Sequence, residues 1–184
     1  MAQTQTKSHY PDPIANEAVV MRTLAVIVDN EPGVLARVIG LFSARGYNID
    51  SLTVTETEHE KNLSRITIVT RGTPAVIVQI KHQLERIVPV HRVVDLTAER
   101  ESLERELALI KVAGRGDNRI EALRLAEIFR AEVIDASIEH FIFQMTGRSV
   151  EVERFIGLMA QLGLVEVSRT GVAAIGRGPE GMRE

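Results

Sequence analysis

The sequence contains no cysteine and no tryptophan, and aromatic residues make up only 4% of its 184 residues. Without cysteine the chain has no disulfide bonds, thiolate nucleophiles or cysteine-ligated zinc or iron–sulfur centres. The formal net charge is −3, so no basic excess exists to neutralise the phosphates of a nucleic acid. No apolar run approaches the roughly 20 residues that span a bilayer. These absences favour a cytoplasmic protein whose partners are small molecules or other proteins.

Residue patterns typical of catalysis are also missing. The five histidines show neither metal-ligand spacing nor a neighbouring carboxylate motif, and no serine lies in a GxSxG motif. Residues 176–181 do spell GxGxxG, but only three residues follow, so no helix can receive a pyrophosphate there. We therefore predict no catalytic residue and no metal site in this chain.

Hydrophobic residues make up 45% of the chain, enough for a sizeable core, and their spacing predicts the first structural unit. Residues 22–29 form a short apolar run typical of a strand, which the turn Asn30-Glu31-Pro32-Gly33 ends. Apolar residues then recur at i, i+3, i+4 and i+7, as in a helix with one buried face, and Gly46 stands where a left-handed C-cap is expected. These helix residues are Leu35, Val38, Ile39 and Phe42.

The remainder of the first unit completes the order β-α-β-β-α-β. Residues 47–56 and 63–71 predict two strands around a polar hairpin tip. Thr73-Pro74 predicts the N-cap and first residue of a second helix, and residues 91–97 predict the closing strand.

The same order begins again after the charged stretch 98–105. Residues 106–112 predict its first strand, Ser149 the cap of its last helix, and residues 164–176 one final strand. We therefore predict an α+β fold of two tandem ferredoxin-like βαββαβ domains, each an antiparallel sheet with both helices on one face. Because the other face of each sheet is bare, we expect dimerisation. The predicted parts are a flexible N-terminal extension (1–20), an effector-binding domain (21–97), a C-terminal ferredoxin-like domain (98–176) and a tail (177–184).

The turn after the first strand is a candidate ligand site. Unpaired N–H groups at the start of a helix attract a carboxylate, and Gly33 lets a ligand approach the backbone closely. Asn30 lies in this turn, and we expect Asn48, at the start of the second strand, to be near it in this fold. A simpler explanation accounts for the same residues: an ordinary strand-to-helix turn in which Asn30 caps the helix.

Residues 28–54, VDNEPGVLARVIGLFSARGYNIDSLTV, strongly resemble the ACT domain of the small regulatory subunit of acetolactate synthase. The likeness continues through LSRITIVTRG, RELALIKV, EIFRAEVIDAS and VSRTGVAAIGRG and covers nearly all of the chain beyond Met21. It implies a regulatory subunit that is not itself an enzyme. In that family the end product valine binds between two paired ACT domains of a homodimer and inhibits the catalytic large subunit. The small subunit also raises the activity of the large one, which carries thiamine diphosphate, FAD and Mg²⁺; no cofactor is expected in this chain.

The resemblance also assigns residues. Its effector site would comprise Asn30, Gly33, Val34 and Leu35 of one protomer with Asn48 and Ile49 of the other. Pro32 and Ala36 stand where some family members have small hydroxyl residues, which bears on affinity. The hairpin residues Glu56, Glu58, Lys61 and Arg65 would contact the catalytic subunit, although from sequence alone a solvated hairpin is the favoured explanation of them.

Two other functions fit parts of the sequence. The loop Gly114–Arg119 lies between a strand and a helix and could hold an acyl phosphate, as in an acylphosphatase-like hydrolase of the same topology; Asp117 as a helix cap explains the loop too. A transcriptional regulator is disfavoured because the 20 N-terminal residues cannot form a helix-turn-helix. The preferred branched-chain effector stays open, because valine, leucine and isoleucine differ by about one methylene.

Overall fold

The computed structural model describes residues 18–58, 62–99 and 101–182. The predicted N-terminal extension therefore lies almost entirely outside the described residues, and Lys61 of the hairpin lies wholly outside them. Within the described part of the chain, no helix is long and apolar enough to cross a membrane.

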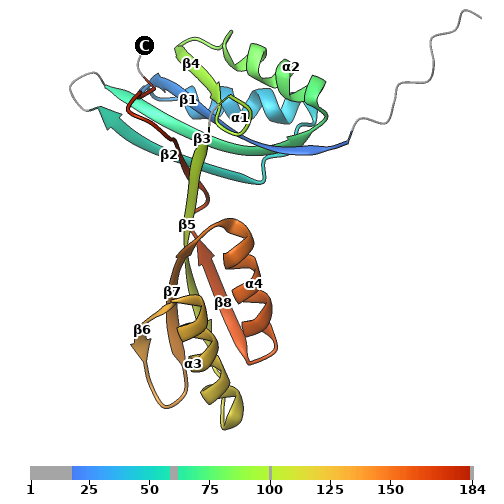
Figure 1. The fold of residues 1–184 in the computed structure, drawn as a ribbon. Helices are drawn as coiled ribbons and strands as arrows, with labels where there is room; N and C mark the ends of the chain where they lie inside the picture. The colour runs from blue at the N-terminus through green and yellow to red at the C-terminus, as the bar shows by residue number, and fades with distance from the viewer. Residues whose placement is uncertain (1–17, 59–61, 100, 183–184) are drawn as a thin grey trace, which may run out of the picture.

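The first unit has the predicted order, and two helices pack on one face of its antiparallel sheet (Figure 1). The strands lie in the order β2-β3-β1-β4, so β2 and β4 are the edges. The buried core between sheet and helices contains Leu24, Val38, Phe42, Ile66 and Ile80. The elements are β1 (Val20–Asp29), α1 (Val34–Arg45), β2 (Ser51–Glu58), β3 (Leu63–Gly72), α2 (Pro74–Leu84) and β4 (Val90–Asp95).

The second unit repeats the arrangement with strand order β6-β7-β5-β8. Its core is built around aromatic rings: Phe155 packs against Phe129 and edge-on against Phe143. The tandem α+β fold is thus confirmed. The elements are β5 (Ser102–Val112), α3 (Asp117–Phe129), β6 (Glu132–Ala136), β7 (Phe141–Gly147), α4 (Ser149–Ala160), β8 (Leu164–Arg169) and β9 (Ala173–Gly176).

Two helix ends in the first unit agree with the sequence, whereas the start of α4 in the second unit differs. Thr73 caps α2 by accepting a hydrogen bond from Val76 N, and Gly46 ends α1 in the left-handed conformation, both as predicted. Helix α4, however, is capped by Arg148 rather than Ser149. The carboxylate of Glu151 accepts from Arg148 N (2.9 Å) and fixes the start of the helix one residue earlier.

The predicted final strand, residues 164–176, is broken into β8 and β9. Gly171 has a φ of 83°, which favours glycine and turns the chain. Strand β9 then pairs with the N-terminal part of β5, so that these two stretches run side by side between the units (Figure 1). A continuous apolar pattern cannot show such a break, because the alternation resumes on the other side of the glycine.

The broken strand also changes the prediction that one face of each sheet is bare. Val172 and Ala174 are buried against Ala25, Val69 and Val94 on the side of the first sheet away from its helices. The first unit is therefore partly covered on its second face by the C-terminal end of its own chain.

Candidate functional site

The turn 30–33 is fixed by backbone contacts to the neighbouring hairpin. Asn30 N donates to Asn62 O (2.7 Å), and the Asn62 amide donates back to Asn30 O (3.4 Å). Gly33 is the N-cap of α1 with a φ of 88°, and no side chain in the described part of the chain caps this helix. The explanation of Asn30 as a helix cap is therefore wrong, and no side chain competes for the N–H groups of the first turn.

The residues that follow the turn differ in exposure. The side chain of Val34 is 3% exposed and belongs to the core, and its backbone N–H donates to Glu31 O (3.4 Å). Leu35 and Ile39 are 37% and 40% exposed and lie one helical turn apart on α1. The start of α1 thus joins N–H groups that no described side chain caps to a small apolar surface.

Asn48 lies at the other end of α1, just before β2, and a polar network holds it. Its amide donates to Asp50 Oδ1 (2.9 Å), and Arg71 Nε donates to the other oxygen of the same carboxylate (2.9 Å). A carboxylate can only accept, so the amide nitrogen of Asn48 must face Asp50. Thr70 Oγ1 donates to Asn48 O (2.5 Å), and Ile49 packs partly into the core.

The two groups of predicted effector residues do not meet within one chain. Helix α1 has 12 residues and is about 18 Å long, with Gly33 at its start and Asn48 beyond its end. The strand register agrees, because Ser51 is level with Thr23 through Val69, whereas the turn follows Asp29. Our expectation that Asn48 lies near Asn30 is therefore wrong for a single chain.

The hairpin residues are placed differently from one another. Glu56 and Glu58 lie near the end of β2, opposite Ser64 and Leu63. Arg65 does not project from the hairpin: its guanidinium donates to Ala174 O (2.7 Å), and its partial burial lowers its pKa from the usual value by desolvation. Arg65 thus contacts the C-terminal segment of its own chain.

The loop Gly114–Arg119 borders a hollow of about 750 Å³ with residues 136–139. Arg119 donates to Ser137 O (2.6 Å), and its guanidinium stacks 3.7 Å from the centre of the Phe141 ring. Gly116, not Asp117, is the N-cap of α3, and Asp117 places a carboxylate in the first turn. Because the arginine is engaged in the fold and the carboxylate would repel an anion, the loop gives the hydrolase alternative no support.

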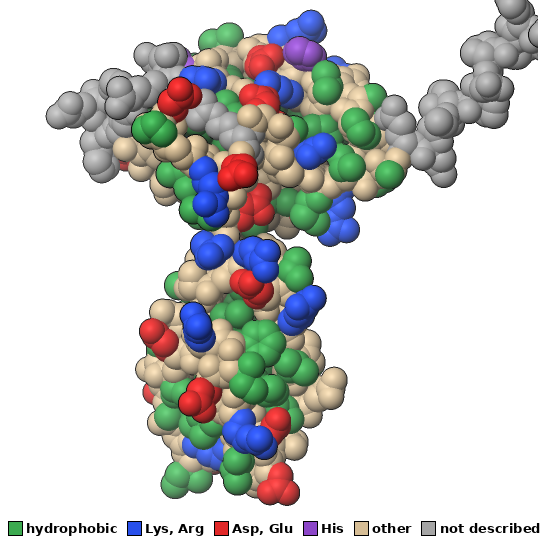
Figure 2. All heavy atoms as spheres, viewed as in Figure 1, with side chains coloured by type: hydrophobic (Ala, Val, Ile, Leu, Met, Phe, Trp, Pro, Cys, Tyr) green, Lys and Arg blue, Asp and Glu red, His purple; other side chains and the backbone are tan. Residues whose placement is uncertain are grey.

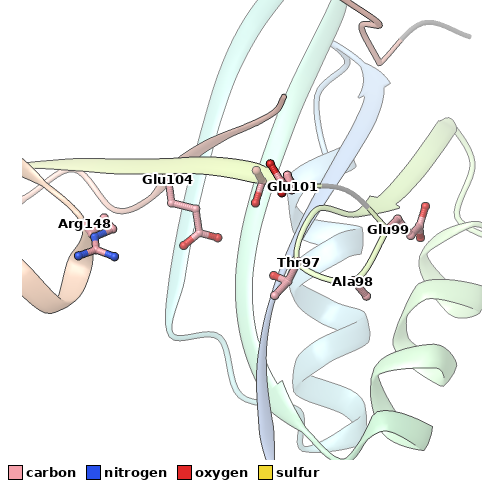
Figure 3. A pocket seen from close by; sticks show the side chains of 7 residues that line it. Thr97, Ala98, Glu99, Glu101, Glu104 and Arg148 are labelled. Carbon is pink, nitrogen blue, oxygen red and sulfur yellow. The ribbon is translucent and has the colours of Figure 1, made fainter. Parts of the chain in front are cut away.

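A hollow of about 580 Å³ at the junction of the two units was not indicated by any sequence motif (Figure 3). Two of its carboxylates are engaged within the chain: Glu104 accepts from Thr23 Oγ1 (2.5 Å), and Glu99 accepts from Lys81 and from Asp95 N. Arg148 lies across from them on the second unit. No group of three potential metal ligands occurs among the described residues. Charges of both signs are interspersed over the face in Figure 2, without a continuous basic surface.

The fold and the turn together define the class of protein: tandem ferredoxin-like domains, the first with the glycine turn and open helix start of an ACT domain. Comparisons with known proteins agree. The family "AHAS small subunit-like ACT domain" matches residues 24–92, and the family "Small subunit of acetolactate synthase" matches residues 105–178.

Individual relatives extend over most of the chain. A probable acetolactate synthase small subunit from Archaeoglobus fulgidus is 47% identical over 85% of this chain and 96% of its own length. The acetolactate synthase isozyme 3 small subunit from Escherichia coli is 43% identical over 88% of this chain and 99% of its own length. The crystal structure of the small subunit from Thermotoga maritima is 40% identical and superimposes with a TM-score of 0.78, covering 88% of this chain and 99% of its own. The chain belongs to the family of acetolactate synthase small subunits, and it is accordingly a regulatory subunit with an ACT domain.

Proposed function

We propose that this subunit binds valine between the ACT domains of a homodimer and transmits the binding to the catalytic large subunit of acetolactate synthase. Valine then inhibits the large subunit, and the small subunit raises its activity in the absence of valine. The observation that carries the proposal is the separation of Gly33 and Asn48 at opposite ends of α1. Each chain then holds two half-sites, one at Gly33 and one at Asn48, and each is completed by the other half-site of a second chain.

The strand order supplies a way to join the half-sites. Strand β2 is an edge, and its last residue, Glu58, opposes Leu63, which also opposes Asp29 beside the turn. If two β2 edges pair antiparallel about a two-fold axis, the start of one β2 lies beside the end of the other. Asn48 of one protomer then lies beside the turn of its partner, and two equivalent sites form.

Exposed apolar side chains support this pairing. Val54, near the middle of β2, is 44% exposed. It lies two residues from Leu52, which packs into the core on the helix side, so Val54 faces that side too. Leu35 and Ile39 are exposed on α1, on the same side of the sheet. Burying these side chains in a dimer would add to the backbone hydrogen bonds of the paired edges.

The chemistry of the joined site suits an α-amino acid. Its carboxylate would accept from the N–H groups at the start of α1, which need no basic side chain. Its ammonium would donate to side-chain oxygens of Asn30 or Asn48. Its branched side chain would contact Leu35 and Ile49. Valine, leucine and isoleucine differ by only about 1–3 kcal/mol in such a pocket, so the choice of valine rests on the family resemblance.

The partner is the large subunit, which carries thiamine diphosphate, FAD and Mg²⁺ in this family, and no cofactor is proposed for this chain. Glu56 and Glu58, at the end of β2, are the proposed contacts to it; Arg65 is less suited because it already binds the C-terminal segment. Valine can alter the large subunit only if it binds the dimer more tightly in one of two states.

Calorimetry tests the ligand. Wild-type protein is expected to bind L-valine with one site per chain, and Asn30→Ala is expected to weaken binding roughly tenfold or more, because it removes a hydrogen bond to a charged group. Glu31→Ala, in the same turn, is the matched control and should bind as the wild type does. Equal affinity of wild type and Asn30→Ala would contradict the assignment of the turn.

A further inference from the structure

The C-terminal segment crosses from the second unit to the first. We call residues 170–176, which follow β8 and include β9, the return segment. Gly171 turns it with a φ of 83°, and it then lies on the sheet face of the first unit that carries no helix (Figure 1). The return segment thus joins two units that are separate in their cores.

The return segment contacts the first residues of β2 closely. Val172 N donates to Ser51 Oγ (2.9 Å), and Thr53 Oγ1 donates to Val172 O (3.1 Å). A Cβ atom added to Gly171 would lie 2.7 Å from Ser51 Oγ and 3.0 Å from Thr53 Cγ2. The backbone at Gly171 therefore touches β2 so closely that only glycine fits there without a shift of the neighbouring atoms.

These contacts are adjacent to the proposed effector residues. Ser51 is the third residue after Asn48 and the second after Ile49. Asp50, between them, donates its N–H to Val69 O (2.8 Å) and holds the Asn48 amide with its carboxylate. A shift of Ser51 would therefore be passed to Asn48 through a short, hydrogen-bonded stretch.

The return segment is held by both units. On the first sheet, Val172 and Ala174 are 5% and 8% exposed. On the second unit, Thr170 N donates to Leu107 O (3.0 Å), and Leu107 N donates to Thr170 Oγ1 (3.1 Å). The segment is thus packed against the first sheet through Val172 and Ala174 and bonded to β5 at Thr170 and along β9.

We propose that the return segment is a positioning element for the effector site: through Ser51 and Thr53 it holds Asn48 and Ile49 in place, and it couples their occupation to the attachment of the C-terminal unit. The inference rests on the proposed valine site. Its residues act through β2 and do not themselves touch the effector. By thermodynamic linkage, the effector must stabilise the packed return segment as much as the segment favours the effector.

Hydrogen exchange of the wild-type protein tests this link without any substitution. L-Valine is expected to slow exchange of the Val172 amide, which bonds to Ser51 Oγ, by about fivefold or more, while the Leu125 amide in α3 keeps its rate. Valine binding without a change at Val172 would overturn the coupling. Failure of valine to bind at all would contradict the proposed function, and with it the coupling between valine and the return segment.

Two matched pairs of variants test the positioning role by calorimetry with L-valine. Gly171→Ala and Gly178→Ala introduce a side chain at φ values of 83° and 98°, but only the first meets other atoms within 4 Å. Gly171→Ala is expected to weaken binding by about fivefold and Gly178→Ala to leave it unchanged. Thr53→Val should weaken binding while Thr53→Ser, which keeps the hydroxyl, restores it. Wild-type affinity in both Gly171→Ala and Thr53→Val would refute the proposal.

Discussion

Mixing two variants that are each expected not to bind valine tests whether each effector site is shared between chains. Gly33→Asp places a side chain where φ is 88° and a negative charge where the carboxylate of the effector would lie. Asn48→Ala removes the other half-site, which lies about 18 Å away along the 12 residues of α1. Each homodimer then has both of its sites damaged, so neither variant alone is expected to bind valine measurably at wild-type saturating concentrations.

The heterodimer differs because the two defects fall in one site. Its second site combines the intact Gly33 of one chain with the intact Asn48 of the other. After unfolding and refolding an equimolar mixture, random pairing gives about half heterodimers, so about a quarter of all sites should bind valine with wild-type affinity. Tandem affinity tags on the two variants purify the heterodimer, in which one site per dimer is expected.

Calorimetry of the purified heterodimer gives the affinity and the number of sites. The control is a heterodimer of wild type with a double variant that carries both substitutions in one chain. This heterodimer should retain no intact site, because each of its two sites receives one defect. Recovery of binding in that control, or no recovery in the complementary heterodimer, would refute a pocket formed by Gly33 and Asn48 of different chains.

Two further predictions concern stability, both measured by denaturant unfolding. Phe143→Ala should lower the free energy of unfolding by about 3–5 kcal/mol, because this ring is fully buried in the second core. Val165→Ala, at a residue that is 59% exposed, should lower it by less than about 1 kcal/mol. Similar losses in the two variants would contradict the core assignment. Arg169→Met should cost about 2–3 kcal/mol because Glu106, whose side chain is 2% exposed, loses its cation, while Lys111→Met breaks an exposed pair and should cost under about 1 kcal/mol. A neutral Arg169→Met would show that the buried carboxylate is stabilised in another way.

Much of the fold follows from local patterns in the sequence. The apolar spacing of Val38 and Phe42 predicts α1, and Thr73 predicts the start of α2, because both depend on neighbours within a few residues. The sequence alone does not indicate the break at Gly171, because a glycine inside an apolar alternation is compatible with an unbroken strand. What places Val172 on the first sheet is packing between residues more than 70 positions apart, which periodicity does not report.

The candidate site shows the same division. Gly33 and the open start of α1 are recognisable from the turn itself. The position of Asn48 relative to the turn cannot be recognised in this way, because it depends on the register of β2 against β3 and on the direction of α1. The place of Arg65 in the sequence predicts a hairpin residue, but its side chain donates to Ala174 O, a contact that depends on the return of the C-terminal segment.

The regulatory role is tested most directly by reconstitution with the acetolactate synthase catalytic large subunit of the same organism. Adding the wild-type small subunit is expected to raise the rate of acetolactate formation and to make it sensitive to valine. Adding Gly33→Asp should raise the rate equally but leave it insensitive to valine, because only the effector site is altered. A cognate pair whose rate neither rises nor responds to valine would contradict the regulatory role proposed here.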